Sequence, residues 1–238
     1  MTLLQTCRRF VALALLGGAI GTTPALAADP IRAVVITGGH EHDAAFYSIF
    51  TGIEEIDALP ILAAADAFKA DIRGKYDVVI MYDFTRDLPD AARQNLRDYV
   101  EAGGGVVVLH HALLDYNNWD WWVDAAVGGS YRLSKPSSGV RNEVLFDVKP
   151  AGDHPIVAGV GPFQVTDEAY NKMRMSPKIR PLLTTDQPAS DPVVAWLGPN
   201  ERFRVVAIQL GHGRSIFALP AYRTLIRNAV LWASGRPK

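Results

Sequence analysis

Hydrophobic residues occur along the chain as short continuous runs, each bounded by glycine, proline or polar residues. Such runs are typical of strands that are buried on both faces of a sheet. In the first half of the chain we expect buried strands over residues 31–37, 76–82 and 106–109, with a weaker one at 60–62.

Longer amphipathic segments separate these runs. We expect helices over residues 44–55, from about 90 to 102, and over 221–234. The second begins after Leu88-Pro89-Asp90 and ends at three glycines, 103–105. The last carries apolar residues at helical spacing and is followed by Gly235 and Pro237, which are typical stop signals.

The order of the elements predicts the fold class. Strands and helices alternate with short connections, which indicates an α/β fold, a mostly parallel sheet with helices on both faces. In the second half, residues 142–148 and 180–184 read as strands, and 193–196 with 203–210 as a hairpin. We therefore expect a flavodoxin-like core with a partly antiparallel C-terminal extension.

The N-terminus has the pattern of a secretory signal peptide. Arg8 and Arg9 precede an apolar run that is too short to span a membrane, and small residues ending at Ala27 follow. We expect residues 1–27 to be cleaved, by Sec or twin-arginine export, leaving one domain over residues 28–238 in the periplasm or outside the cell.

Composition then excludes several kinds of chemistry. The only cysteine is Cys7, so the chain after Ala27 has no disulfide, thiolate nucleophile or cysteine-bound metal. Without Arg8 and Arg9 the net charge is about −3, and no basic stripe is present. This argues against a nucleic-acid partner.

Histidines and acidic residues gather where the predicted strands end. His40, His42 and Asp43 follow the first strand, Asp83 the next strong one, and the pair His110-His111 the third. In open α/β sheets, sites lie outside the carboxyl ends of the strands, so these residues should share one edge.

Each histidine segment also has a structural interpretation. Adjacent residues point in different directions, so we expect at most one of His110 and His111 to face the cleft; the structural alternative is that one of them caps a backbone group. We expect Asp43 to cap a helix. His212 lies between two glycines, which favours a functional role, whereas His154 reads as structural.

Two further segments remain open between function and structure. The pair Asp167-Glu168, close to Tyr170, could divide acid and base duties, but by composition alone it reads as a solvated turn. The aromatic residues that follow the histidine pair could stack on a sugar or fill the core: Tyr116, Trp119, Trp121 and Trp122.

Taken in order, these motifs resemble the ThuA-like (trehalose utilisation) family, within the class I glutamine amidotransferase-like superfamily. The resemblance covers nearly all of residues 28–238. It is carried by "GGGVVVLHHA", Trp119 with Gly128-Gly129, "DHPIVAGV", "DEAY", "PVVAW", "VVAIQLGHG" and "LPAYRTLIRNAVLWASG".

The resemblance implies roles for individual residues. His110 takes the elbow position that holds a nucleophilic cysteine in the amidotransferases, so glutamine hydrolysis through a thiolate is excluded. It implies His110, His212 and Glu168 as catalytic residues. It also implies His111, Trp119, Asp167 and Tyr170 as substrate-binding residues. Relatives often carry a histidine after the Gly-Gly pair, and residues 130–134 of this chain have none.

The family is associated with trehalose and related disaccharides, beside sugar dehydrogenases that make 3-ketoglycosides. The resemblance therefore implies an enzyme that cleaves or isomerises a 3-keto-glycoside, with His110 as base and Glu168 or His212 as acid. The alternative is a non-catalytic sugar-binding module that kept the fold.

The three strand ends also permit a metal site. His42, His110 and His212 could hold a divalent ion such as zinc, with an open fourth position. A metal-free cluster of hydrogen-bonded histidines would have the same sequence, so both interpretations stand.

Overall fold

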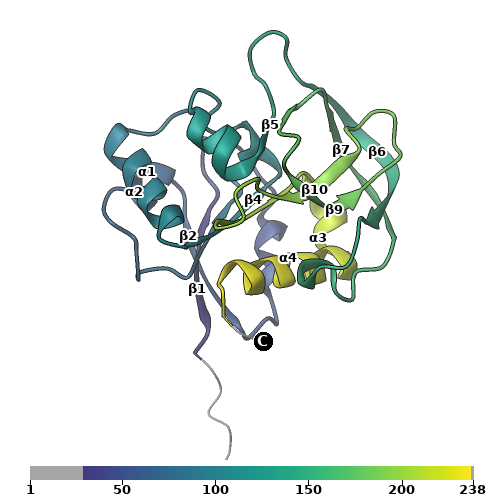
Figure 1. The fold of residues 1–238 in the computed structure, drawn as a ribbon. Helices are drawn as coiled ribbons and strands as arrows, with labels where there is room; N and C mark the ends of the chain where they lie inside the picture. Colours follow the sequence, from purple (N-terminus) through teal and green to yellow (C-terminus); the bar gives the residue numbers. More distant parts are fainter. Residues whose placement is uncertain (1–28, 237–238) are drawn as a thin grey trace, which may run out of the picture.

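The computed structural model describes residues 29–236, and the expected signal peptide lies outside this range. Its centre is a nine-stranded mixed sheet with the strand order β2-β1-β3-β4-β11-β10-β9-β6-β7 (Figure 1). The strands of this sheet are β1 (Ile31–Ile36), β2 (Ile56–Ile61), β3 (Val78–Met81), β4 (Gly105–Leu109), β6 (Gly139–Pro150), β7 (Phe163–Asn171), β9 (Arg180–Thr184), β10 (Val193–Leu197) and β11 (Arg204–Ile208). A separate pair is formed by β5 (Gly129–Ser130) and β8 (Arg174–Met175).

Five neighbouring strands, β2, β1, β3, β4 and β11, form the parallel half of the sheet. Along each buried strand, alternate side chains enter two different cores. Val35, Ile80 and Val107 point to one face, and Val34, Val79 and Val106 to the other. This explains the continuous apolar runs of the sequence, because a strand covered on both faces has no polar side.

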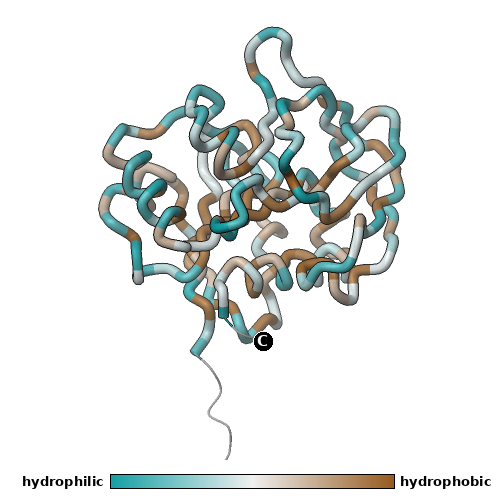
Figure 2. Tube along the Cα trace, in the orientation of Figure 1, coloured by the Kyte–Doolittle hydropathy of each residue, from teal (hydrophilic) through white to brown (hydrophobic). Residues whose placement is uncertain are grey.

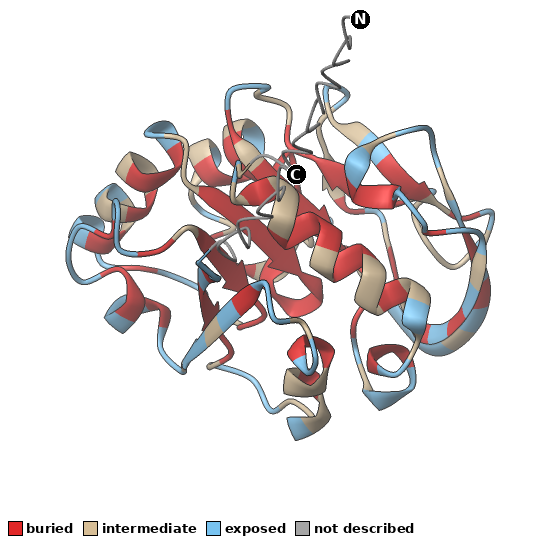
Figure 3. Cartoon of the chain, turned by 90° about the horizontal axis from the view of Figure 1, so that it is seen from below, coloured by how far each residue is buried: buried red, intermediate tan, exposed pale blue. Residues whose placement is uncertain are grey.

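Helices cover both faces. The 3₁₀ helix η1 (Ala44–Phe50) and the helix α4 (Pro220–Ala233) pack on one face, with α3 (Arg214–Phe217) and the 3₁₀ turn η4 (Pro155–Val157). The helices α1 (Ala64–Ala67) and α2 (Asp90–Glu101) and the π-helical segment η3 (Trp121–Val127) cover the other. The central strands are buried and hydrophobic between these layers (Figures 2 and 3).

The remaining strands extend the sheet in antiparallel order. β10 pairs with β11 and with β9, β6 pairs with β9, and β7 closes the edge against β6. The fold class expected from the sequence is therefore confirmed, with a parallel core and antiparallel strands from the second half of the chain.

Two local predictions were wrong. The helix expected over 44–55 is a 3₁₀ helix that ends at Phe50, because Gly52 turns the chain with a φ of +78°. Asp43 caps it as expected, accepting a hydrogen bond from Ala45 N at 2.8 Å. The turn expected around Asp167-Glu168 lies within strand β7, where pairing with β6 buries Asp167.

Among residues 29–236, no helix has both the length and the hydrophobicity needed to cross a membrane.

Candidate active site

Strand β4 ends at a strained turn. His110 has a φ of +47°, in the left-handed region that residues with a side chain rarely adopt. It begins the 3₁₀ helix η2 (His110–Leu114), so the chain reverses direction directly after the strand. Backbone strain of this kind costs on the order of 1–3 kcal/mol and tends to persist where function requires it.

His110 is fully buried, and both nitrogens of its ring contact other polar groups. Its Nδ1 lies 2.7 Å from the carbonyl oxygen of Gln209, which can only accept a hydrogen bond. The proton of the neutral ring is therefore on Nδ1, and Nε2 presents a lone pair. That Nε2 lies 3.1 Å from the Tyr170 hydroxyl and 3.3 Å from His212 Nδ1.

Glu168 lies between two of these histidines. One carboxylate oxygen is 3.3 Å from His110 Nε2 and the other is 3.4 Å from His212 Nδ1. Burial raises the pKa of Glu168, but its interactions with His110, His212 and Tyr170 outweigh burial, so the net pKa is lowered. Glu168 is thus a carboxylate at neutral pH, and 12% of its side chain is exposed.

The His212 loop is held by Asp167. The two Asp167 oxygens accept hydrogen bonds from Gly211 N at 2.7 Å and His212 N at 2.9 Å. Gly211 has a φ of +132°, and a Cβ there would lie 2.6 Å from the Tyr222 hydroxyl, so only glycine fits. Asp167 therefore positions His212 rather than facing a substrate.

His111 is almost fully buried, and its Nδ1 has no hydrogen-bond partner among the described residues. Burial lowers the pKa of His111 to about 2, assisted by the nearby charges of His110, His40 and His212. The ring is therefore neutral, and it stacks on His40 with the ring centroids 4.1 Å apart. An unpaired buried polar atom costs about 1–3 kcal/mol, so this nitrogen requires an explanation.

Several of these side chains border a cavity of about 280 Å³. Its lining residues fall into a polar set and an apolar set, which we name the polar wall and the apolar wall. The polar wall is formed by His40, His111, Glu168, Tyr170 and His212, and the apolar wall by Phe84, Leu114, Tyr131, Leu133 and Val140. His110 does not line the cavity; it lies behind the polar wall and contacts Tyr170, Glu168 and His212.

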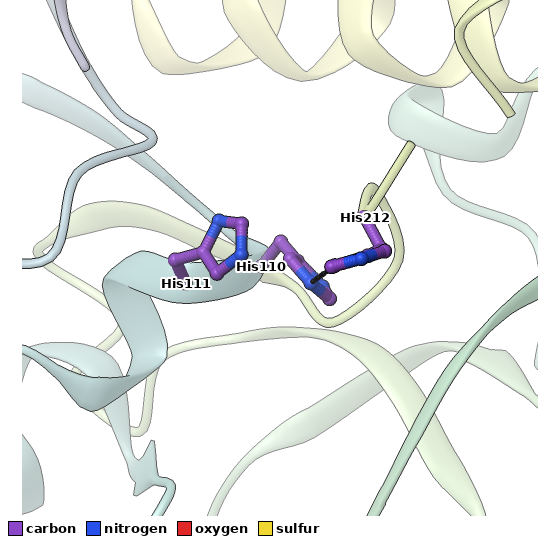
Figure 4. Close-up of side chains that lie close together, drawn as sticks. All are labelled: His110, His111 and His212. Atoms are coloured by element: carbon purple, nitrogen blue, oxygen red, sulfur yellow. Dashed lines mark hydrogen bonds between the residues drawn. The ribbon is translucent and has the colours of Figure 1, made fainter. Parts of the chain in front are cut away.

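The structure thus brings together most of the residues singled out from the sequence. We name His110, His111, Glu168, Tyr170 and His212 the histidine cluster. Figure 4 shows its three histidines, two on the turn after β4 and one on the loop before α3. The ligand atoms of these three lie within 4.8 Å of one another, so they could hold a metal ion.

Two candidate residues, His42 and Trp119, lie outside the cavity lining. His42 packs edge-on against Phe46, Tyr47 and Tyr82, and it is His40 that stacks on His111. Trp119 contacts other aromatic rings and the guanidinium of Arg93, and it does not line the cavity.

The apolar wall was missed by the sequence reasoning. Tyr131 and Leu133 lie within residues 130–134, the segment that has no histidine in this chain. This departure from the family pattern was the one sequence signal that the segment belongs to the site. Phe84 and Val140 come from a loop after β3 and from β6, and no motif marks them.

A second polar group lies at the same edge of the sheet. Asp83 follows β3 and Asp115 follows η2, and both are buried. Thr85 joins them, since its hydroxyl donates to Asp83 and its backbone N–H to Asp115, each at 2.6 Å. Burial raises the pKa of Asp83 to about 6, and burial with the charge of Asp83 raises that of Asp115 well above its usual value. We name these two residues the acidic pair.

Comparison with solved structures agrees with the fold. A ThuA-like protein of Parabacteroides merdae ATCC 43184 is 17% identical with a TM-score of 0.71, covering 86% of this chain and 90% of its own. One from Bacteroides uniformis ATCC 8492 is 21% identical with a TM-score of 0.69, covering 89% and 95%. PurLQS of Thermotoga maritima is 10% identical with a TM-score of 0.56, covering 86% and 99%. At these identities the likeness concerns the fold alone.

A search of curated proteins found no match. The family model described as trehalose utilisation matches residues 32–233, which is nearly the whole of the described range. This span includes every residue of the histidine cluster and of the acidic pair. The chain therefore belongs to the ThuA family.

Proposed function

We propose that the protein is an exported enzyme that cleaves or isomerises a 3-keto-glycoside by proton transfer. One observation carries this proposal: an ionised carboxylate, Glu168, borders the cavity and is held between two histidines. The family description, trehalose utilisation, supports a sugar as the substrate.

The keto group at C3 acidifies the C–H bond at C2. Glu168 takes that proton, and the electron pair moves toward the keto oxygen to form an enolate. His212 borders the same cavity and can donate a hydrogen bond to the developing charge. When the enolate collapses, the C1–O bond breaks and Glu168 returns the proton to the leaving oxygen. The products are an unsaturated keto-sugar and an alcohol.

His110 has a supporting role in this scheme. Because it lies behind the cavity wall, it does not reach the substrate directly as the sequence suggested. Its Nε2 contacts Glu168, His212 and Tyr170, so it fixes the groups that do. Isomerisation uses the same first step, with the proton returned to carbon instead of oxygen.

The apolar wall suits a sugar. Pyranose rings present C–H faces that pack on aromatic side chains, and Tyr131 and Phe84 supply such rings in the cavity. The polar and apolar lining residues together orient the substrate, with its keto group toward Glu168.

The test is incubation of the protein with 3-ketotrehalose, followed by NMR. We expect loss of the C2 proton signal and release of glucose, or exchange of that proton with solvent deuterium. Trehalose is the matched control, because without the keto group its C2 proton is not acidic. Saturable binding of 3-ketotrehalose without turnover or exchange would refute the enzyme and support a sugar-binding module.

Two parts of the proposal concern the cell. An enzyme that oxidises the sugar at C3 must supply the substrate, so a sugar dehydrogenase is the expected functional partner. Export predicts a mature N-terminus near Ala28 in the periplasm of a Gram-negative host, measured by N-terminal sequencing. An intact Met1 in the cytoplasm alone would contradict it.

A further inference from the structure

His111 belongs to the one group of residues that the described part of the chain offers as a metal site, together with His110 and His212. We propose that His110, His111 and His212 bind a divalent transition-metal ion of the zinc type at the floor of the cavity. This goes beyond the proposed function, because it concerns binding that can be measured without a substrate.

The distances within the cluster support this site. Two imidazole nitrogens that bind one tetrahedral ion at about 2.1 Å lie about 3.4 Å apart. His110 Nε2 and His212 Nδ1 are 3.3 Å apart, which is long for a direct hydrogen bond and close to that spacing. One ring nitrogen from each of His110, His111 and His212 lies within 4.8 Å of the other two, so binding one ion requires the side chains to draw closer together.

The protonation of His110 is already set for a metal. Its Nδ1 donates to the Gln209 carbonyl, which leaves a lone pair on Nε2, 3.1 Å from the Tyr170 hydroxyl and 3.3 Å from both His212 Nδ1 and a Glu168 oxygen. Metal-binding histidines almost always donate their other ring nitrogen to a carbonyl or carboxylate in this way.

The charges around the cluster favour a cation. Glu168 lies 3.3 Å from His110 Nε2 and 3.4 Å from His212 Nδ1, so its negative charge lies beside both nitrogens. Nitrogen ligands without sulfur suit zinc, copper or nickel better than magnesium or calcium.

This set differs from the one expected from the sequence. His42 packs among aromatic rings, and His111 takes its place, because the turn at His110 brings both members of the pair to the same side. A metal bound through His212 Nδ1 leaves His212 Nε2 to contact a substrate, so the site is compatible with the proposed reaction.

The probe is Co²⁺, whose visible absorption reports four-coordinate binding by nitrogen ligands, with Zn²⁺ as competitor. Untagged protein is stripped with a chelator, titrated with each ion, and its metal content is measured by equilibrium dialysis. We expect one ion per chain, visible absorption from the bound Co²⁺, and displacement by zinc. Binding well below one ion per chain would overturn the proposal.

Two variants make the assignment specific. His212→Ala, on an exposed loop, should weaken Co²⁺ binding at least about 100-fold, while thermal unfolding shows that it remains folded. His42→Ala is the matched control and should bind like the wild type. If both variants bind Co²⁺ equally weakly, or if neither binds it more weakly than the wild type, the ion is bound elsewhere. These readouts need no keto-sugar, so a failed turnover assay leaves the metal result unaffected.

Discussion

The histidine cluster and the acidic pair lie at the same edge of one sheet but differ in their access to solvent. Asp83 and Asp115 are sealed, and Thr85 links the loops that carry them. Of the histidine cluster, four residues border an open cavity, and His212 has 45% of its side chain exposed. Neighbouring strands thus deliver polar groups to two distinct environments.

The difference shows how burial decides the use of ionisable groups. A carboxyl group buried beside another carboxyl favours the protonated form and serves to join two loops. Glu168, beside histidines and a cavity, keeps its charge and can exchange a proton with a ligand. Solvent access and partners, rather than residue type, separate a structural carboxyl group from a candidate catalytic one.

The largest expected effect concerns the charge of Glu168. Glu168→Gln keeps the shape of the side chain and removes the proton acceptor, so we expect about a 10³-fold loss of kcat on 3-ketotrehalose with an unchanged melting temperature. Glu54→Gln, on an exposed surface position, is the control. Full activity of Glu168→Gln would show that another group takes the proton.

The next prediction concerns the acidic pair and pH. The pKa of Asp83 is raised to about 6 in the folded protein, above the ordinary value of 3.8. Its contribution to stability is therefore complete below about pH 4 and is lost as the pH rises through about 6. The amide of Asp83→Asn resembles the protonated acid and does not ionise, so the variant should not lose this contribution as the pH rises.

Urea unfolding between pH 4 and 7 measures this difference. We expect the free energy of unfolding of the wild type to fall relative to Asp83→Asn by on the order of 2–3 kcal/mol across that range. Asp57→Asn, on an exposed edge strand, should follow the wild type. Parallel curves for wild type and Asp83→Asn would mean that Asp83 is not protonated.

A third prediction tests the backbone that holds the histidine cluster. Gly211→Ala places a Cβ 2.6 Å from the Tyr222 hydroxyl at a φ of +132°, so we expect a loss of about 2 kcal/mol in unfolding free energy, with lower activity. Gly213→Ala has extended backbone and open space, and it should be nearly neutral. Similar melting temperatures for the two variants would contradict the close approach.

The smallest expected effect concerns the apolar wall. Leu133 is 42% exposed at the mouth of the cavity, and Leu133→Ser should raise KM roughly 3- to 10-fold with kcat unchanged, because it contacts substrate away from the reacting atoms. Leu62→Ser alters a leucine that is 68% exposed and does not line the cavity, and it serves as control. A fall in kcat would place Leu133 nearer the chemistry.

Much of the fold could be predicted from the sequence, because burial on both faces leaves a direct mark. The strands over 31–37, 76–82 and 106–109 correspond to β1, β3 and β4, and residues 180–184 form β9 with the same limits. The helix expected over 221–234 is α4. Strand β7 was missed because Asp167, a buried acid, is stabilised by N–H groups that lie far away in the sequence.

The sequence by itself also pointed to the histidine cluster, since residues that follow parallel strands lie at one edge of the sheet. Tertiary structure alone decided where these side chains lie and which atoms they contact. His110 lies behind the cavity wall. His111, rather than His42, lies in one group with His110 and His212. Asp167 accepts a hydrogen bond from the backbone N–H of His212. The physical reason is that roles depend on distances of a few ångströms between side chains up to 102 residues apart, such as His110 and His212. Local sequence patterns fix which strand end a residue occupies, but packing of the whole chain fixes which atoms it meets.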